Sequence, residues 1–334
     1  MDYFIRAKGP QPDGGRAAYW RWWTEQWNMA QQDGILGFLY AANLPALPAA
    51  RPPADLPPSK VFHGLCVASL HTTLLDSRDD VHFLFKSSPF GTQSHGFNPH
   101  NSFQLNAYGE SLLTTCVYRD LHGSPFHYKW THSTVAHNAV LVNGEGQIKH
   151  TRAPHGRIVA ERLTPEFDYI AGDATDAYGG RLTRYIRHVA FVKGEHPFIV
   201  LCDELEAKDP STFQFMLHGF KPFEVDEANA ALRLVLPKAG VEVKYLSPTP
   251  LRFRQWDGYD PRPRREFPNQ WHAEAGTQEK RKKLLVFTVL VPHRAGKAPE
   301  WNTTRIGEGV EVTVGDRTHS VILKEGELQL TSDR

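Results

Sequence analysis

The pattern of apolar and polar residues changes near residue 60. Before it, aromatic residues recur at helical spacing, and after it the chain has many short runs in which apolar and polar residues alternate. Between residues 16 and 42, aromatic and other apolar residues recur at helical spacing without β-alternation, which predicts one or two helices. Residues 43–58 contain six prolines and predict a linker or a crossing between domains. We therefore expect a helical segment and linker over residues 1–58 and a second domain over residues 59–334.

Runs rich in Val, Leu, Phe and Thr, separated by turn residues, follow from residue 61 onward. No helical pattern lies between them, which favours a mainly β fold, an antiparallel sandwich, over α/β units. The stretch 252–281 is polar and rich in arginine, proline and glutamine, and we expect a long loop there. The expected strands are 61–75, 81–85, 102–107, 111–118, 139–142, 157–163, 184–192, 198–205, 213–217, 232–236, 241–246, 284–291, 310–314 and 320–323.

Composition excludes several classes of partner. The net charge of the 334 residues is +1, so no overall field steers the chain to nucleic acid or to a membrane. No apolar run reaches the roughly 18 residues of a membrane span, and the first residues lack the apolar core of a signal peptide. Cys66, Cys116 and Cys202 are an odd, sparse set that predicts neither a disulfide framework nor a metal site.

Histidines cluster in the middle of the chain, with six of the 17 between His95 and His137. Taken singly, each fits a solvated histidine on an exposed loop. Taken together with interleaved Asn, Tyr and Trp, they predict a pocket that binds polar, ring-shaped ligands and moves protons near neutral pH. The candidate catalytic residue is His95, and the candidates for substrate binding or site support are Asn98, His100, Asn101, Trp130, His137 and Asn138.

Each candidate also has a structural interpretation. Asn98 and Asn101 are either turn formers, because Asn tolerates left-handed dihedrals, or amides that grip sugar hydroxyls. Trp130 is either a core residue or a sugar platform. His137 precedes a strong strand and either orients the site or hydrogen-bonds a neighbouring loop as a buried structural histidine. The residues alone leave these alternatives open.

Several ordered blocks of the chain resemble the β-sheet domain of heparinase II/III-like polysaccharide lyases. They are residues 85–95, 101–103, 107–110, 130–131 and 136–147, with 184–192 and 198–203 continuing the pattern. The resemblance runs from about residue 61 to 217 and implies an N-terminal α/α toroid followed by stacked antiparallel sheets. Only about 45 residues precede the linker, so we expect a short helical remnant of the toroid and, as a partner, a separate helical toroid segment.

The resemblance implies β-elimination beside a uronic acid in an acidic polysaccharide or oligosaccharide. A base removes the C5 proton, charged or polar groups stabilise the carboxylate, and an acid protonates the leaving oxygen. By the family pattern, His95 is the sheet-domain histidine that serves as base or acid. The toroid residues that share the work would precede Met1. The resemblance also implies a periplasmic or secreted protein.

The chain departs from the family pattern at its metal ligands. Phe97 stands where the family has a histidine ligand, and Thr114 and Thr115 stand where it has an acidic ligand, so only His137 matches. A phenyl ring cannot bind zinc, so we expect no zinc and no other cofactor. The alternative is a zinc site rebuilt in another geometry by His100, Asp120 or His122.

Two functions from different classes remain. In the first, the chain is the sheet-domain portion of a polysaccharide lyase. In the second, it is a non-catalytic carbohydrate-binding or structural module derived from a lyase. A glycoside hydrolase is disfavoured, because that reaction needs two facing carboxylates and the histidine-rich segments offer few acids. A reading frame for a helical toroid upstream of Met1 would favour the enzyme.

Overall fold

The computed structural model describes residues 14–27, 48–89, 97, 99–117, 120–153 and 155–332. The chain divides into two compact units, Met1–Leu56 and Pro57–Arg334. In the first unit, helix α2 (Gly14–Gln26) covers the start of the segment expected to be helical, and residues 28–42 lie outside the described residues. Within this unit the carboxylate of Asp55 accepts a 2.8 Å hydrogen bond from the Tyr19 hydroxyl and pairs with Arg51 at 2.8 Å. No described helix is long and apolar enough to cross a membrane.

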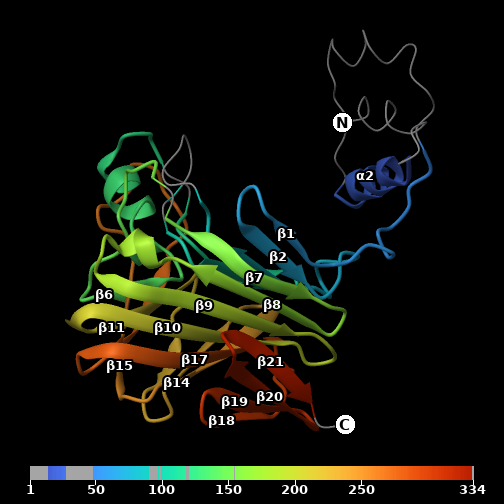
Figure 1. Ribbon diagram of the computed structural model, residues 1–334. Helices are drawn as coiled ribbons and strands as arrows, with labels where there is room; N and C mark the ends of the chain where they lie inside the picture. The colour runs from blue at the N-terminus through green and yellow to red at the C-terminus, as the bar shows by residue number, and fades with distance from the viewer. Residues whose placement is uncertain are drawn as a thin grey trace. The chain divides into compact units, whose positions relative to one another are not determined.

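The described residues of the second unit form four antiparallel sheets, with short helical turns between strands (Figure 1). The first sheet comprises β1 (Lys60–Phe62), β2 (Val67–His71), β3 (Val81–Lys86), β4 (Ser102–Ala107) and β5 (Glu110–Leu113). The eight-stranded sheet has the order β12 (Glu224–Asp226), β13 (Ala231–Val235), β14 (Ala239–Leu246), β17 (Arg281–Arg294), β10 (Phe198–Ser211), β9 (Leu182–Val192), β8 (Phe167–Asp173) and β7 (Arg157–Leu163). A four-stranded sheet has the order β15 (Leu251–Asp257), β16 (Trp271–Thr277), β11 (Phe213–Gly219) and β6 (Val140–Val142), and the last comprises β18 (Trp301–Arg305), β19 (Gly309–Val314), β20 (Arg317–Lys324) and β21 (Glu327–Ser332). The helical turns are η1 (His127–Thr131), η2 (Thr134–Ala136) and η3 (Thr175–Tyr178).

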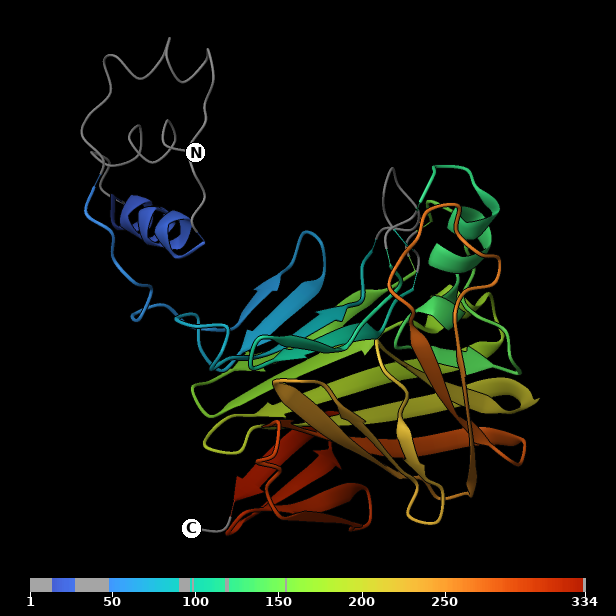
Figure 2. The same cartoon turned by 180° about the vertical axis from the view of Figure 1, so that it is seen from behind.

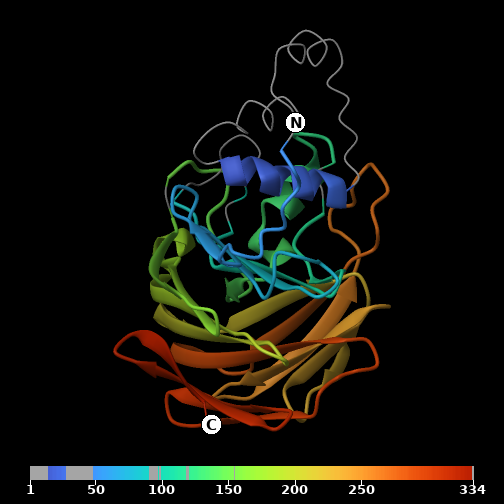
Figure 3. The ribbon, with the colours of Figure 1, turned by 90° about the vertical axis from the view of Figure 1, so that its right-hand side faces the viewer.

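The eight-stranded sheet lies at the centre of the second unit and is covered on both faces (Figures 1 and 2). Alternate side chains of its strands, such as Val189 and Leu201, join the core formed with the β1–β5 and β15-β16-β11-β6 sheets. The intervening side chains, such as Ala190 and Val200, join a second core with the C-terminal sheet. The period-2 alternation of strands therefore builds a stacked sandwich, as the sequence predicted. Figure 3 shows the C-terminal sheet as the lowest layer.

The expected long loop over residues 252–281 is wrong, because this stretch contains strands β15 and β16. On β15, Leu251 and Phe253 point into the core, while Arg252 and Arg254 are exposed on the other face. The stretch resembled a loop because only one face of β15 and β16 is apolar. The two strands pair with each other, and β16 also pairs with β11. Residues 258–270 between the two strands are the true loop.

Other differences concern strand boundaries and short strands. The single strand expected over residues 61–75 is instead a hairpin of β1 and β2 that ends at His71, with a turn in which Cys66 has a φ of 49°. The strand expected over 111–118 ends at Leu113. Strands β8, β12, β18 and β21 were not expected. β12 has only three residues, and β8 is buried on both faces and carries Asp168 and Gly172, so neither shows an apolar–polar alternation. Pairing with neighbouring strands makes each of the four a strand.

Candidate functional site

The segment that carries η1 and η2 leads into β6 and brings Trp130 into a small core of its own. The Trp130 side chain is 4% exposed, and its ring packs against His272 at 4.9 Å and Tyr259 at 5.8 Å between ring centroids. An aromatic ring that stacks on a sugar needs at least one face open to solvent, and the Trp130 ring is covered. The arrangement favours the core interpretation of Trp130 and a supporting role.

Asn101 and Arg187 join the first sheet to the central sheet. Asn101 takes the left-handed conformation, with φ 51°, and its Nδ2 donates to the carbonyl of Gly172 at 2.9 Å. Its own carbonyl accepts a 2.7 Å bond from Nη1 of Arg187. Arg187 also grips both carboxylate oxygens of Asp203, at 2.7 and 3.0 Å. Burial alone would lower the pKa of Arg187, but the Asp203 carboxylate holds that pKa above its ordinary value.

Asn138 is fully occupied with backbone partners. Its Nδ2 donates to the carbonyls of Phe103 and Thr114, at 2.9 and 2.7 Å, and its Oδ1 accepts a 2.9 Å bond from the backbone N–H of His218. The amide thus fastens the ends of β4 and β5 to β11. Because every one of these groups is buried and paired, Asn138 supports the site rather than offering its amide to a sugar.

His100 is fully buried and locked by its neighbours. Its backbone N–H donates to Oε1 of Gln147 at 2.7 Å, and Nε2 of Gln147 donates back to its carbonyl at 2.8 Å. Its Nδ1 accepts from the backbone N–H of Ser88 at 3.1 Å, so the ring proton resides on Nε2. Burial and the nearby Lys86 lower the pKa of His100 to about 2, so the ring is neutral at physiological pH.

His137 is a neutral imidazole of fixed tautomer. Its Nδ1 donates to the carbonyl of Ser133 at 3.0 Å, which leaves the lone pair on Nε2, 3.5 Å from Sγ of Cys116. Burial lowers the pKa of His137 to about 3, and burial raises the pKa of the Cys116 thiol to about 12. The pair is therefore an uncharged thiol and imidazole across the range in which enzymes normally operate.

Lys86 and Phe97 face this imidazole. The ammonium group of Lys86, at the end of β3, donates a hydrogen bond to the carbonyl of Phe97. Burial lowers the pKa of Lys86 to about 8, close enough to neutrality for the side chain to exchange its proton. The Phe97 ring lies 5.8 Å from His137 and 5.1 Å, edge on, from His132. Lys86 thus holds the backbone two residues after the predicted catalytic His95.

Four imidazoles form a group that contacts Phe97 through His132. Nε2 of His127 and Nε2 of His132 are 3.0 Å apart, a hydrogen bond that requires one protonated and one unprotonated nitrogen. The ring of His132 also stacks on His150 at 4.9 Å, and His122 lies 4.8 Å from His127. Burial and the adjacent histidines lower the pKa of His132 to about 4. His132 is therefore uncharged near neutral pH.

The structure gathers part of the predicted site. His100, Asn101, His137 and Asn138 converge around the start of β4 and the approach to β6, whereas Trp130 reaches them only through other residues. His95 and Asn98 lie outside the described residues, so their roles stay predictions. Sequence reasoning missed Lys86, Cys116, His150 and the Arg187–Asp203 pair. Lys86 had a local signal, a cation that closes an alternating strand; the others become neighbours only in the folded chain.

The described residues do not fit a zinc ion at the positions that the resemblance marks. Phe97 presents a ring to His137, and the Thr114 hydroxyl accepts a 2.7 Å bond from Gln270 instead of standing free as a ligand. Within the described ranges, no group of three or more His, Cys, Asp or Glu side chains is arranged to hold a metal ion.

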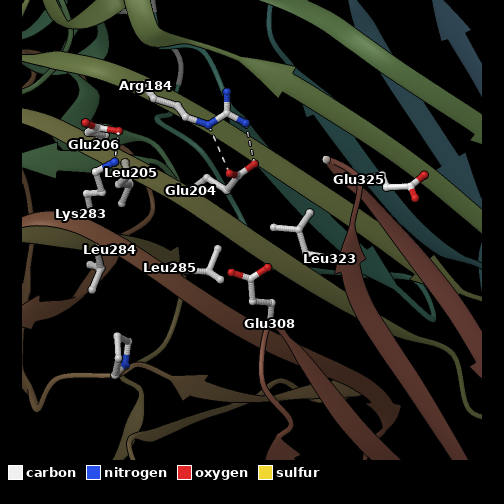
Figure 4. Close-up of a pocket in the computed structure, with 12 residues that line it drawn as sticks. Arg184, Glu204, Leu205, Glu206, Lys283, Leu284, Leu285, Glu308, Leu323 and Glu325 are labelled. Atoms are coloured by element: carbon white, nitrogen blue, oxygen red, sulfur yellow. Dashed lines mark hydrogen bonds and ion pairs between the residues drawn. The ribbon is translucent and has the colours of Figure 1, made fainter.

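One pocket of the second unit, about 600 Å³, lies away from this cluster, where β9, β10 and β17 meet the C-terminal sheet (Figure 4). Its charged lining consists of Arg184, Lys283, Glu204, Glu206, Glu308 and Glu325. Arg184 pairs with Glu204 at 2.9 Å, and Lys283 pairs with Glu206 at 3.1 Å. Two carboxylates are left over, so the pocket repels an anionic ligand.

The stacked antiparallel sheets define a mainly β protein of the stacked-sandwich class, with a polar cluster beside β3, β4 and β6. The chain belongs to the heparinase II/III-like family: the family described as "Heparinase II/III-like, C-terminal" matches residues 67–304. No curated protein sequence matches the chain.

Solved structures share the fold at low sequence identity. A heparinase III matches 98% of this chain and 48% of its own, with a TM-score of 0.65 and 14% identity. The heparan sulfate lyase HepC from Pedobacter heparinus matches 100% of this chain and 48% of its own, with a TM-score of 0.65 and 12% identity. Another heparinase III structure matches with a TM-score of 0.62 and 14% identity, over 86% of this chain and 44% of its own. The chain spans about half the length of these structures.

Proposed function

We propose that the chain is the sheet-domain portion of a polysaccharide lyase that cleaves an acidic, uronic-acid-containing polysaccharide by β-elimination. The observation that carries the proposal is the meeting of Lys86 and the neutral His137 at Phe97, in a chain of this family. The similar structures named heparinase III and heparan sulfate lyase make a heparan-sulfate-like glycan the first substrate to test. The same resemblance supports export and a helical toroid segment that completes the cleft.

Each side chain supplies a distinct part of the chemistry. Elimination requires a base for the C5 proton and a counter-charge for the uronate carboxylate, on which negative charge builds. His95 takes the proton-transfer role by its place in the motif. Lys86, with a pKa of about 8, is mostly cationic at neutral pH, and it donates a hydrogen bond to the carbonyl of Phe97, two residues after His95 in the sequence. His137 stays neutral, and the centre of its ring lies 5.8 Å from that of Phe97.

The test is the appearance of a 4,5-unsaturated uronate, which absorbs in the near ultraviolet, when the protein and its helical segment are incubated with acidic polysaccharides. His95→Ala should lower turnover by ~10²- to 10⁴-fold, the usual contribution of a positioned acid or base, with substrate affinity changed much less. His196→Ala is the matched control, because His196 lies exposed on the turn between β9 and β10. An active His95→Ala variant would remove the assignment. Binding of the polysaccharide without unsaturated product would favour the carbohydrate-binding module instead.

A further inference from the structure

The outer face of the β15-β16-β11-β6 sheet carries a groove of about 620 Å³ that the proposed chemistry does not use. Its lining includes Arg252 and Arg254 from β15, Glu274 and Gly276 from β16, and Thr212 and Gln214 at β11. The inward side chains of the same strands, such as Phe213, Phe215 and Ala275, lie in the main core. The groove therefore stands on a rigid, well-packed support.

Gly276 makes the hollow. The register places Gly276 between Gln214 on one neighbouring strand and Arg252 on the other, so the strip across the sheet lacks a side chain at its middle position. A Cβ built there would find Glu274 Oε1 at 3.4 Å and Gln214 Cγ at 3.6 Å, which are ordinary contacts. Glycine inside a strand weakens it and marks a place where another group approaches closely. Among the described residues other than Gly276 and its chain neighbours, the nearest backbone atom to that Cβ position is the carbonyl oxygen of Arg252, at 3.9 Å.

The charges select an anion. The exposed Arg252 makes no ion pair with any described residue. Arg254 is held in place, with Nη2 at 2.6 Å from Oε2 of Glu274 and its guanidinium 4.9 Å from the centre of the Trp256 ring. The groove thus contains the guanidinium groups of Arg252 and Arg254 and one carboxylate, that of Glu274, which pairs with Arg254. The positive charge of Arg252 is left for a ligand. A planar guanidinium binds carboxylate or sulfate through two parallel hydrogen bonds.

Contacts within the sheet link the strands that line the groove to the candidate site. Arg252, Arg254 and Trp256 share one face of β15, and Trp256 contacts His272, which contacts Trp130. On β11, Gln214 lies four residues from His218, the neighbour of Asn138, a separation of ~13 Å at the rise of a strand. A linear polysaccharide reaches that far, whereas a single sugar does not.

We propose that this groove is a remote binding subsite for the anionic groups of an acidic oligosaccharide, carboxylate or sulfate, with Arg252 as its main contact. The inference rests on the proposed function, because the ligand is the substrate bound at the candidate site. Binding energy gained at a distance from the reacting bond is available to orient the substrate there. The acidic pocket of Figure 4 offers no such contact.

The experiment measures affinity by calorimetry for oligosaccharides of increasing length, one series sulfated and one unsulfated. The wild-type protein should gain affinity once the chain is long enough to reach the groove. Arg252→Ala should reduce the gain by about tenfold, about 1.4 kcal/mol, with a shallower dependence on salt. Gly276→Leu should also reduce the gain in affinity, because the leucine side chain fills the hollow. The backbone at Gly276 does not have a positive φ, so leucine is tolerated there. The series with the larger gain identifies the anion.

Arg317→Ala is the matched control, because it removes the same charge from an exposed position on β20. A length-dependent gain that survives in Arg252→Ala, or that falls equally in Arg317→Ala, would overturn the subsite. If Gly276→Leu fails to fold, Arg252→Ala alone decides. The readout is separate from lyase activity: absence of unsaturated product refutes the proposed function, while the length dependence of binding still tests the groove.

Discussion

Removal of the Asp203 charge should be among the most destabilising single changes in the second unit. The Arg187 and Asp203 side chains are 3% and 1% exposed, and two hydrogen bonds join them. Asp203→Asn keeps the volume but leaves the Arg187 charge buried without a counter-charge. Breaking a buried pair in this way costs about 3–5 kcal/mol, because the remaining ion stays out of water. For a unit of this size that corresponds to a fall in melting temperature of roughly 6–15 °C.

The assay is thermal and urea unfolding of the variant beside Glu206→Gln. Glu206 lies on the same strand as Asp203 and pairs with Lys283 at 3.1 Å, but these side chains are 30% and 75% exposed. Water screens such a pair, so its loss should cost at most about 1 kcal/mol. Equal effects of the two substitutions would refute the reasoning. Asp203→Asn should also loosen the segments held by Arg187 at the carbonyls of Asn101 and Asn138.

Three further predictions follow from the groups around Phe97. His137→Ala should lower the free energy of unfolding by about 2–4 kcal/mol in urea denaturation, while the exposed His196→Ala changes it by under about 0.5 kcal/mol. The pKa of Lys86 in the folded protein is about 8, below its ordinary 10.5, so the unfolded chain binds the proton more tightly. The free energy of unfolding should therefore rise as the pH increases from about 8 to 10.5. Lys86→Met should flatten this rise, and an unchanged slope in that variant would contradict the prediction. His132 has a folded pKa of about 4 against an ordinary 6.5, so stability should fall as the pH drops through this window, less steeply in His132→Gln, as measured by urea unfolding at a series of pH values.

The sequence by itself determined the class of fold and the family. Alternation in the run 102–107 predicted a strand whose bounds the structure reproduces, because the run has one apolar face and turn residues at both ends. The run 157–163 was also predicted with the bounds of β7. Ordered motifs from residue 85 to 147 indicated the family that matches residues 67–304. The same motifs directed attention to His100, Asn101, His137 and Asn138, which the fold does bring together.

Only the tertiary structure decided what those residues do. In the sequence, Asn138 is simply a polar residue before a strand. In the structure, its side-chain amide hydrogen-bonds backbone groups of Phe103, Thr114 and His218, which are distant in the sequence. Strand β15 reads as a polar loop because half of its residues face outward and its pairing energy comes from β16. The lowered pKa of Lys86 likewise arises from burial, which depends on how sheets stack rather than on neighbours along the chain. Local pattern fixes which face of a strand is apolar, but burial and partners are set by contacts between distant segments.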